Sequence, residues 1–270
     1  MIELALAQRL RETAEGFPRE LVEAQLEDLP RVTFQVELIL ERVAADARVC
    51  DIGSGVGLFP AACAAAGMRP TMMDDFAPPF ADEESARRVP DAPDAVNFDR
   101  VDEALGYHRS LGVDVVMRDP LEEGFGFAPA SLDVVTSFDS MEHWHRSPKQ
   151  LFAEIREALR PGGLFVLGVP NCVNLRKRLT VPFGYGKWSQ MSHWYEPEFF
   201  RGHVREPDVD DLHYIARDLD LREVEILGRN WAGRVSPNPW LRRLTPLVDG
   251  LLARRPTLCS DLYLLGRKPV

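Results

Sequence analysis

Cysteine is scarce in this sequence, with four in 270 residues and no CxxC pair among them. The four thiols lie mostly in apolar runs: Cys50, Cys63, Cys172 and Cys259. Isolated, apolar cysteines exclude a disulfide framework and are typical of reduced thiols in the cytosol. We therefore expect a cytoplasmic protein.

Long apolar runs and a basic leader are also missing. Residues 1–17, MIELALAQRLRETAEGF, lack both the basic start and the apolar stretch of a secretory signal. No later segment reaches the roughly 18 uninterrupted apolar residues of a membrane-spanning helix. The sequence therefore predicts a soluble, unexported protein without a stable membrane anchor.

Positive charge is in deficit, since 32 Lys and Arg face 42 Asp and Glu and give a formal net charge of −10. A protein that grips nucleic acid through a general electrostatic footprint needs a basic excess to neutralise phosphates. We therefore expect no nucleic-acid partner. What the chain does have is 45% hydrophobic residues, enough for the core of one large α/β domain or of a domain with a lid.

Apolar residues at helical spacing predict two helices, at 2–14 and 31–44, before any strand. From residue 48 onward, short β-type runs alternate with helical segments. The predicted strands are 48–52, 70–75, 113–120, 131–138 and 164–169, and the predicted helices between them are 58–67, 97–112 with Asn97 as cap, and 148–159. This alternation predicts right-handed crossovers and a doubly wound, largely parallel sheet.

The helix from Pro148 carries its own start and stop signals. Ser147 is a plausible N-cap, Pro148 takes the first helical position and Gln150 completes a capping-box pattern. The triplet Pro161-Gly162-Gly163 then ends the helix.

Residues 171–211 interrupt this rhythm with a density of aromatic residues far above the 9% of the whole chain. The aromatic residues are Phe183, Tyr185, Trp188, Trp194, Tyr195, Phe199 and Phe200. Regular elements return as a helix at 209–221, a strand at 221–228, a helix at 239–253 and a terminal strand at 261–269. We predict a helical segment at 1–46, a ligand-binding core at 47–170, an aromatic substrate cap at 171–211 and completion of the sheet by 212–270.

A glycine loop, VCDIGSGVG, follows the first predicted strand and opens a helix. Glycines in this setting let the backbone approach a ligand closely. Gly53, Gly55 and Gly57 give the spacing GxGxG rather than the dinucleotide pattern GxGxxG, and Asp51 stands two residues before the first glycine. A carboxylate there would repel a pyrophosphate but can hold a cationic amino group.

Two further acids follow the next predicted strands. Asp74 ends the second strand, where a carboxylate can accept both hydroxyls of a ribose, and Asp119 ends the third, where it could accept from an adenine amino group. The carboxyl ends of parallel strands meet at one edge of a sheet. With Asp51, these acids describe a site for an adenosine that carries an amino acid and no phosphate, which is S-adenosylmethionine.

These motifs resemble those of class I S-adenosylmethionine-dependent methyltransferases. The similar segments are CDIGSGVG, TMMDD, RDPL, LDVVTSFDSMEHW, LRPGGLFVLGVPN and GHVREP, which span about residues 48–228. The resemblance implies a Rossmann-like, mostly parallel, seven-stranded sheet with N-terminal helices and a substrate cap. It also implies the cofactor contacts, namely Asp51, Gly53, Ser54, Gly55, Asp74, Asp75, Asp119, Pro120, Leu121 and Phe138. Asp75 duplicates the ribose acid, and strand register favours Asp74.

The absence of two motifs narrows the range of possible methyl acceptors. Methyltransferases of the exocyclic amines of bases carry a DPPY-like or NPPY-like tetrapeptide after the fourth strand, where residues 137–140 read SFDS. Cytosine C5 methylation needs a thiolate, and although Cys172 follows the fifth strand, the rest of that motif is missing and the net charge is wrong. We therefore expect a small-molecule acceptor.

His143 is the candidate catalytic residue. Methyl transfer to a hydroxyl is an in-line displacement, for which an enzyme aligns the reactants and removes the acceptor's proton. His143 stands just past the fourth predicted strand, where related small-molecule methyltransferases often place a functional histidine. The alternative is a histidine that bonds only backbone or water at a helix start.

The spacing Asp139-x-x-Glu142-His143 resembles the metal segment of ubiquinone-biosynthesis O-methyltransferases, with Asp139 in place of a glutamate. A hard cation such as Mg²⁺ bound there would orient a substrate oxygen and lower its pKa. The Glu-His pair also occurs in family members that use no metal. Both roles of His143, as base and as metal ligand, therefore stay open.

Residues 174–207 resemble methyltransferases of glycan and natural-product assembly. Aromatic faces stack on sugar rings or acyl chains, and a basic set could hold an anionic acceptor; this set is Arg176, Lys177, Arg178 and Arg205. We expect an O-methyltransferase of a saccharide or related natural product. The alternatives are a quinone or phenol O-methyltransferase, a nicotinamide-dependent oxidoreductase on a similar fold, and a binding module that keeps the cofactor without catalysis.

The basic amphipathic helix at 239–253 leaves three further alternatives. Its apolar face could lie on a membrane, pair with a second subunit in a homo-oligomer, or pack on the domain. Packing on the domain is favoured because a sheet face needs covering.

Overall fold

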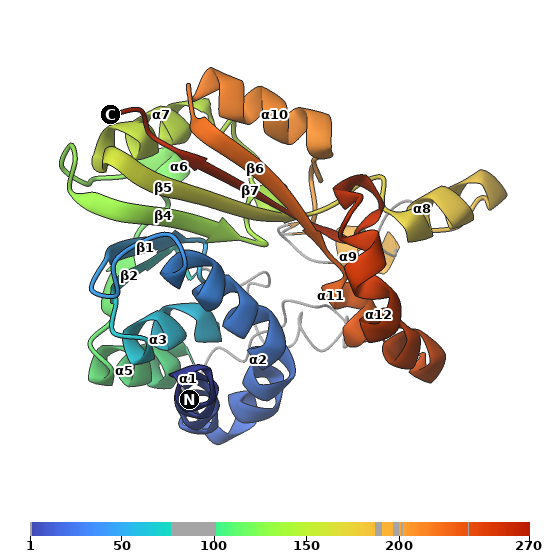
Figure 1. Ribbon diagram of the computed structural model, residues 1–270, viewed down its shortest axis with the longest axis horizontal. Helices are drawn as coiled ribbons and strands as arrows, with labels where there is room; N and C mark the ends of the chain where they lie inside the picture. Colours follow the sequence, from blue (N-terminus) through green and yellow to red (C-terminus); the bar gives the residue numbers. More distant parts are fainter. Residues whose placement is uncertain (1, 77–100, 187–190, 197–199, 201, 237) are drawn as a thin grey trace.

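The computed structural model describes residues 2–76, 101–186, 191–196, 200, 202–236 and 238–270. Its centre is a seven-stranded sheet in the order β3-β2-β1-β4-β5-β7-β6. The pairs from β3 to β5 are parallel, and β7 runs antiparallel to both β5 and β6. This is the mostly parallel, Rossmann-like α/β fold that the sequence predicts (Figure 1).

The strands are β1 (Arg48–Ile52), β2 (Arg69–Asp74), β3 (Asp114–Met117), β4 (Leu132–Phe138), β5 (Leu159–Pro170), β6 (Arg222–Arg229) and β7 (Asp261–Arg267). The α-helices are α1 (Ile2–Glu15), α2 (Arg19–Leu40), α3 (Leu58–Ala65), α5 (Val101–Ser110), α6 (Pro120–Glu123), α7 (Lys149–Ala158), α8 (Leu175–Thr180), α9 (Met191–Tyr195), α10 (Val209–Asp218), α11 (Trp231–Arg234) and α12 (Pro239–Leu252). Short 3₁₀ turns are η2 (Met141–His143), η3 (Val181–Phe183) and η4 (Pro256–Leu258).

Helices cover both faces of the sheet. In Figure 1, α1, α2, α3 and α5 lie on one side, and α7 and α10 lie on the other. Side chains alternate between these two layers, since Val49 of β1 packs toward α1, α2 and α3 whereas Cys50 and Ile52 pack toward α7 and α10. Because both faces are buried, the central strands are nearly continuous apolar runs, which is why the sequence pattern identifies them.

The second helix differs from its prediction. It was expected at 31–44 but extends over Arg19–Leu40, with Pro30 in its interior. A proline removes one helical hydrogen bond and usually marks a boundary. Here apolar residues on both sides of Pro30, such as Leu26 and Val36, pack into the same core, and this tertiary packing outweighs the local cost.

The predicted capping box of α7 is also wrong. Pro148 is itself the N-cap, and the helix begins at Lys149. Gln150 donates to Glu154 one turn further on instead of reaching back to the helix start. The helix ends at Ala158, and Pro161-Gly162-Gly163 falls inside β5, at a register shift in its pairing with β4. The predicted cap Asn97 lies outside the described residues.

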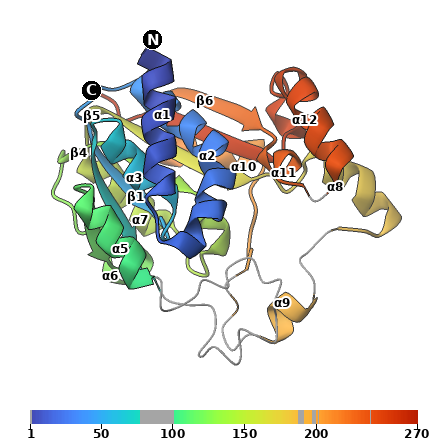
Figure 2. The same ribbon diagram turned by 90° about the horizontal axis from the view of Figure 1, so that it is seen from below.

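Residues 171–211 contain short helices rather than a long regular element. Figure 2 shows α8 and α9 standing out from the sheet. The aromatic side chains described there are largely exposed: Phe183, Tyr185, Trp194 and Tyr195. Phe200 is half-buried and lines the cavity described below, while Trp188 and Phe199 lie outside the described residues. The substrate cap therefore stays a prediction.

The apolar face of α12 does not pack on the domain, and the favoured prediction for it is wrong. Its large side chains are exposed: Trp240, Leu241, Leu244, Leu247, Val248 and Leu251. The opposite, more polar face is buried, where Asp249 accepts from Asn230 and pairs with Arg234. Membrane and second-subunit contacts of α12 stay predictions. In the described part of the chain, none of the helices combines the length and the apolar character needed to cross a bilayer.

Candidate active site

A cavity of about 830 Å³ opens at the carboxyl ends of β1, β2 and β4. This volume lies in the range of small-molecule sites. All ten side chains or backbones predicted to contact the cofactor line it: Asp51, Gly53, Ser54, Gly55, Asp74, Asp75, Asp119, Pro120, Leu121 and Phe138. The structure thus brings the predicted set together around one space, and their contacts with a cofactor stay predictions.

The glycine loop is shaped by two backbone requirements. Gly53 and Gly55 have φ values of +69° and +50°, a conformation that side chains disfavour. A Cβ at Gly53 would lie 1.8 Å from Ser140 Oγ, so this glycine also allows β1 and β4 to approach each other. A Cβ at Gly55 would meet nothing within 4 Å. The loop therefore leaves bare backbone beside the cavity, as a closely approaching ligand needs.

Ser54, between these glycines, has an unmet hydrogen-bonding requirement. Its Oγ is buried and has no hydrogen-bond partner among the described residues. Buried hydroxyls are normally paired, and Ser54 lines the cavity. A polar group of a bound ligand would satisfy it, which is one observation that this loop fits the amino-acid part of S-adenosylmethionine.

Asp51 is the buried acid at the base of the loop. Its Oδ1 accepts from Thr136 Oγ1 at 2.6 Å. Burial raises the pKa of Asp51 to about 8, the charge of Asp74 adds to the rise, and the bond from Thr136 opposes it. A cationic ligand group beside Asp51 would restore the ionised form. This electrostatic demand fits an ammonium and disfavours a phosphate.

Asp74, at the end of β2, is fixed by two backbone amides. Its Oδ2 accepts from Gly55 N at 2.9 Å and its Oδ1 accepts from Phe76 N at 2.7 Å. Burial raises the pKa of Asp74 to about 6 against the effect of these two bonds. Each carboxylate oxygen keeps a further lone pair for a ligand hydroxyl. The neighbouring Asp75 is exposed, which agrees with the preference for Asp74.

Asp119 closes the same side of the cavity. It is the N-cap of α6, and its Oδ1 accepts from Leu121 N at 2.9 Å. The cap fixes Pro120 and Leu121 at the cavity wall, next to the carboxylate.

The opposite wall is built around Asp139, whose φ is +48°. Its carboxylate forms an ion pair with Arg31 of α2, which also binds Asp28. Burial raises the pKa of Asp139, and Arg31 opposes that rise. Sequence reasoning missed Arg31 because nothing in the spacing of α2 signals a contact with a residue 108 positions away.

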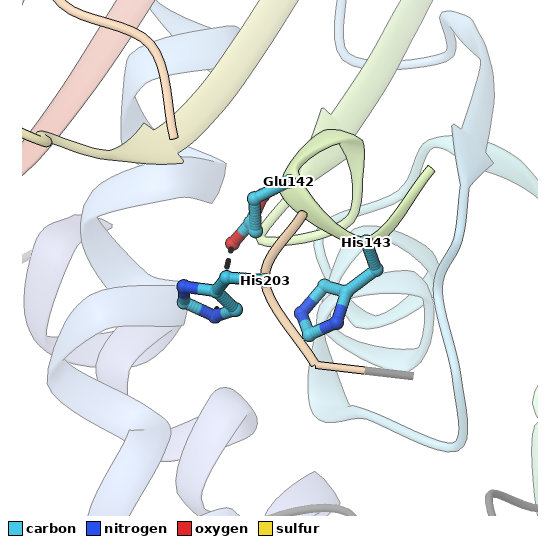
Figure 3. Close-up of side chains that lie close together, drawn as sticks. All are labelled: Glu142, His143 and His203. Carbon is cyan, nitrogen blue, oxygen red and sulfur yellow. Dashed lines mark ion pairs between the residues drawn. The ribbon is translucent and has the colours of Figure 1, made fainter. Parts of the chain in front are cut away.

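The predicted metal set of Asp139, Glu142 and His143 is not the set that the fold assembles. Asp139 is directed to Arg31, and the ligand atoms that lie within 4.8 Å of one another belong to Glu142, His143 and His203 (Figure 3). His143 lines the cavity, and its catalytic role stays a prediction. His203 lies in the segment GHVREP, which resembled the family without suggesting a role.

Three of the four basic residues predicted for an anionic acceptor are directed to the protein itself. Lys177 pairs with Glu206, Arg205 pairs with Asp211, and Arg178 donates to the carbonyl oxygens of Val173 and Thr257. Of the four predicted residues, which also include Arg176, none lines the described cavity wall. The cations that do line it are Arg31 and Arg146.

The doubly wound sheet, the GxGxG loop and the acids at the strand ends define the fold of a class I S-adenosylmethionine-dependent methyltransferase. A family model described as a methyltransferase domain matches residues 22–226. The chain therefore belongs to this methyltransferase family. A comparison with curated proteins finds no match.

Solved structures agree on the fold. An S-adenosylmethionine-dependent methyltransferase from Archaeoglobus fulgidus is 18% identical, with 94% of this chain and 97% of that chain covered and a TM-score of 0.53. The 1,6-didemethyltoxoflavin-N1-methyltransferase of Burkholderia thailandensis is 19% identical, with 93% and 82% covered and a TM-score of 0.51. The phosphoethanolamine N-methyltransferase 2 of Haemonchus contortus is 17% identical, with 88% and 53% covered and a TM-score of 0.51.

Proposed function

We propose that the protein transfers the methyl group of S-adenosylmethionine to a hydroxyl of a small molecule, a saccharide or a related natural product. The observation that carries this proposal is that His143 lines the same cavity as Asp51 and the glycine loop. One cavity thus holds the residues suited to a methyl donor and a side chain suited to an acceptor oxygen.

In this proposal, the cofactor half of the cavity binds and orients S-adenosylmethionine. Asp51 receives the ammonium, Ser54 and the loop amides receive the carboxylate, and Asp74 receives the ribose hydroxyls. Asp119 and Leu121 border the adenine. When bound, S-adenosylmethionine supplies an electrophilic methyl group on its sulfonium, and the acids keep the cofactor in place for an in-line transfer.

The acceptor half combines polar and aromatic side chains. Its wall includes Phe138, Trp144 and Phe200 together with His143 and His145. A hydroxylated ring suits such a wall, since its faces stack on aromatic rings while its hydroxyls bond to polar groups. His143 is assigned to the acceptor oxygen, whose proton must leave during transfer.

The acceptor atom is the part of the proposal most in need of a test, because two of the structural neighbours named above are N-methyltransferases. Labelled methyl transfer from S-adenosylmethionine to a panel of sugars, quinols, phenols and amines tests it. We expect label in sugar methyl ethers. Label in amines alone would overturn the proposal of O-methylation. Label in quinols or phenols alone would keep O-methylation but show that the acceptor is not a saccharide.

His143→Ala tests the catalytic assignment. We expect the variant to bind S-adenosylhomocysteine within about twofold of the wild type and to lose turnover by about 100-fold, the usual size of a general acid–base contribution. His213→Ala, on the exposed side of α10, is the matched control and should change neither quantity. Unchanged turnover of His143→Ala would remove this residue from the mechanism.

A further inference from the structure

A histidine that sequence spacing does not connect to Glu142 and His143 converges with them beside the acceptor half of the cavity (Figure 3). Glu142 and His143 belong to η2, and His203 comes from the segment that precedes α10. The imidazole rings of His143 and His203 are perpendicular, with centroids 4.7 Å apart. His203 Nε2 lies 3.9 Å from Glu142 Oε1. One ligand atom from each residue lies within 4.8 Å of the others, close enough for the three residues to hold a single ion.

Glu142 is the buried member of this cluster, with 1% of its side chain exposed. Its Oε2 has no hydrogen-bond partner among the described residues. A buried carboxylate oxygen without a donor is costly, and a cation beside Oε2 would satisfy it.

His203 is oriented by a second carboxylate. Its Nδ1 lies 2.8 Å from Glu206 Oε1, and Glu206 is in turn paired with Lys177. Burial would raise the pKa of Glu206, but the bonds from His203 and Lys177 outweigh it and lower the pKa to about 2. A carboxylate on one ring nitrogen leaves the other nitrogen as a ligand, the arrangement that orients metal-binding histidines.

The backbone holds the two segments of the cluster together. Glu142 O accepts from Val204 N at 2.6 Å and from Arg205 N at 3.3 Å. The residue after His203 is thereby fixed to the turn that carries Glu142 and His143. The juxtaposition is a product of the fold and does not depend on long, flexible side chains alone.

We propose that Glu142, His143 and His203 bind a divalent first-row transition ion of the Zn²⁺ type. Two imidazoles and one carboxylate suit such an ion, whereas Mg²⁺ prefers a set of oxygens. Three protein ligands leave a fourth tetrahedral position free. Since His143 lines the cavity, the ion lies at its wall. There the ion would hold the acceptor oxygen and lower its pKa, in place of proton removal by His143 itself. This further role rests on the proposed function, but ion binding itself does not.

Titration of the chelator-treated full chain with Zn²⁺, and with Co²⁺ followed by visible absorption, tests the site without any methyl acceptor. We expect one ion per chain, and at least about tenfold weaker binding for His203→Ala. Glu206→Gln should weaken binding by about tenfold, as loss of an orienting partner does. His145→Ala, a histidine on the same cavity wall but outside the cluster, is the matched control and should bind like the wild type.

Asp139→Asn separates this cluster from the set expected from sequence spacing, and it should retain the ion. S-adenosylhomocysteine affinity and the thermal transition of each variant show that it is folded. The proposal is overturned by a wild type that binds no stoichiometric ion, by His203→Ala binding like the wild type, or by Asp139→Asn losing the ion as His203→Ala does. Absence of sugar methylation with intact ion binding would instead count against the proposed function.

Discussion

The two halves of the cavity are built in different ways. In the cofactor half, Asp51, the glycine loop and Asp74 lie at the ends of neighbouring strands, and short backbone segments set their positions. In the acceptor half, Asp139 depends on Arg31, 108 residues away, and Glu142 depends on the segment of His203. The proposed donor site is thus encoded in local backbone geometry, whereas the proposed acceptor site is encoded in contacts between distant segments.

The halves also differ in how their acids are neutralised. Asp51 and Asp74 have raised pKa values caused mainly by burial. In the acceptor half, Asp139 has Arg31 as its partner and Glu206 has Lys177. A cationic ligand would therefore complete the cofactor half electrostatically, while Asp139 and Glu206 in the other half are balanced by the protein.

The largest expected effect comes from Gly53→Ala, which acts where the halves meet. The new Cβ would strike Ser140 Oγ, and φ at this position is +69°. Ser140 cannot turn away freely because its Oγ accepts from Trp144 Nε1 at 3.0 Å. We expect S-adenosylhomocysteine affinity, measured by calorimetry, to fall about 30-fold, equivalent to ~2 kcal/mol of strain.

Gly112→Ala is the control for this substitution. Its φ is +82°, but a Cβ there meets nothing within 4 Å and the position lies away from the cavity. Gly112→Ala should lower the temperature of thermal unfolding through backbone strain alone and leave cofactor affinity unchanged. Equal losses of affinity in both variants would mean that the contact with Ser140 is irrelevant.

The second prediction uses pH to test the unbalanced charge of Asp51. A carboxyl whose folded pKa is raised to about 8 stabilises the fold fully below its ordinary pKa near 4, and that contribution is lost as pH rises through 8. Ligand binding follows the opposite course, because an ammonium favours the ionised form. S-adenosylhomocysteine affinity should therefore rise about fivefold between pH 7 and pH 8, above the range in which Asp74 titrates.

Asp51→Asn should remove this rise and weaken binding by about tenfold at pH 8, equivalent to ~1.4 kcal/mol. Calorimetry in two buffers of different ionisation enthalpy should detect proton release from the wild type only. A wild-type affinity that stays flat from pH 7 to pH 8 would contradict the assignment of Asp51 to the ammonium.

The same contrast explains what could be predicted from the sequence. The strands, the glycine loop and the strand-end acids follow short periodic patterns, so their neighbourhood in space comes from the topology of a parallel sheet. Pro30 concealed the first half of α2. Arg31, which holds Asp139, lies in the predicted half, but nothing in the spacing of that helix signals the contact. The spacing Asp139-x-x-Glu142-His143 suggested a ligand set, but the backbone turn at Asp139 directs its carboxylate to Arg31.

His203 shows the same limit. Nothing local connects it to η2, since the link is made by backbone bonds from Val204 and Arg205 to Glu142. The exposure of the apolar face of α12 could not be predicted either. An amphipathic pattern indicates that a face is apolar but does not indicate what covers it.

A third, smaller effect is expected for Arg31→Gln, which tests whether the acceptor half can be changed without changing the cofactor half. Loss of the ion pair leaves Asp139 half-buried without its cation, so the acceptor wall should loosen. We expect turnover to fall about fivefold and the free energy of unfolding to fall by ~1 kcal/mol, with S-adenosylhomocysteine affinity unchanged. Arg11→Gln, in an exposed pair on α1, is the control and should be silent. A cofactor affinity that falls as much as turnover would show that the halves are not independent.

The smallest effect is expected for Asp75→Asn and sharpens the description of the cofactor half. Asp74 is fixed by the amides of Gly55 and Phe76, whereas Asp75 is exposed at the mouth of the same cavity. Asp75→Asn should change S-adenosylhomocysteine affinity by less than about twofold. Asp74→Asn should weaken it several times more, because an amide offers one acceptor oxygen where the carboxylate offers two. If the order is reversed, the ribose hydroxyls bind Asp75, and Asp74 serves only to hold the glycine loop against β2.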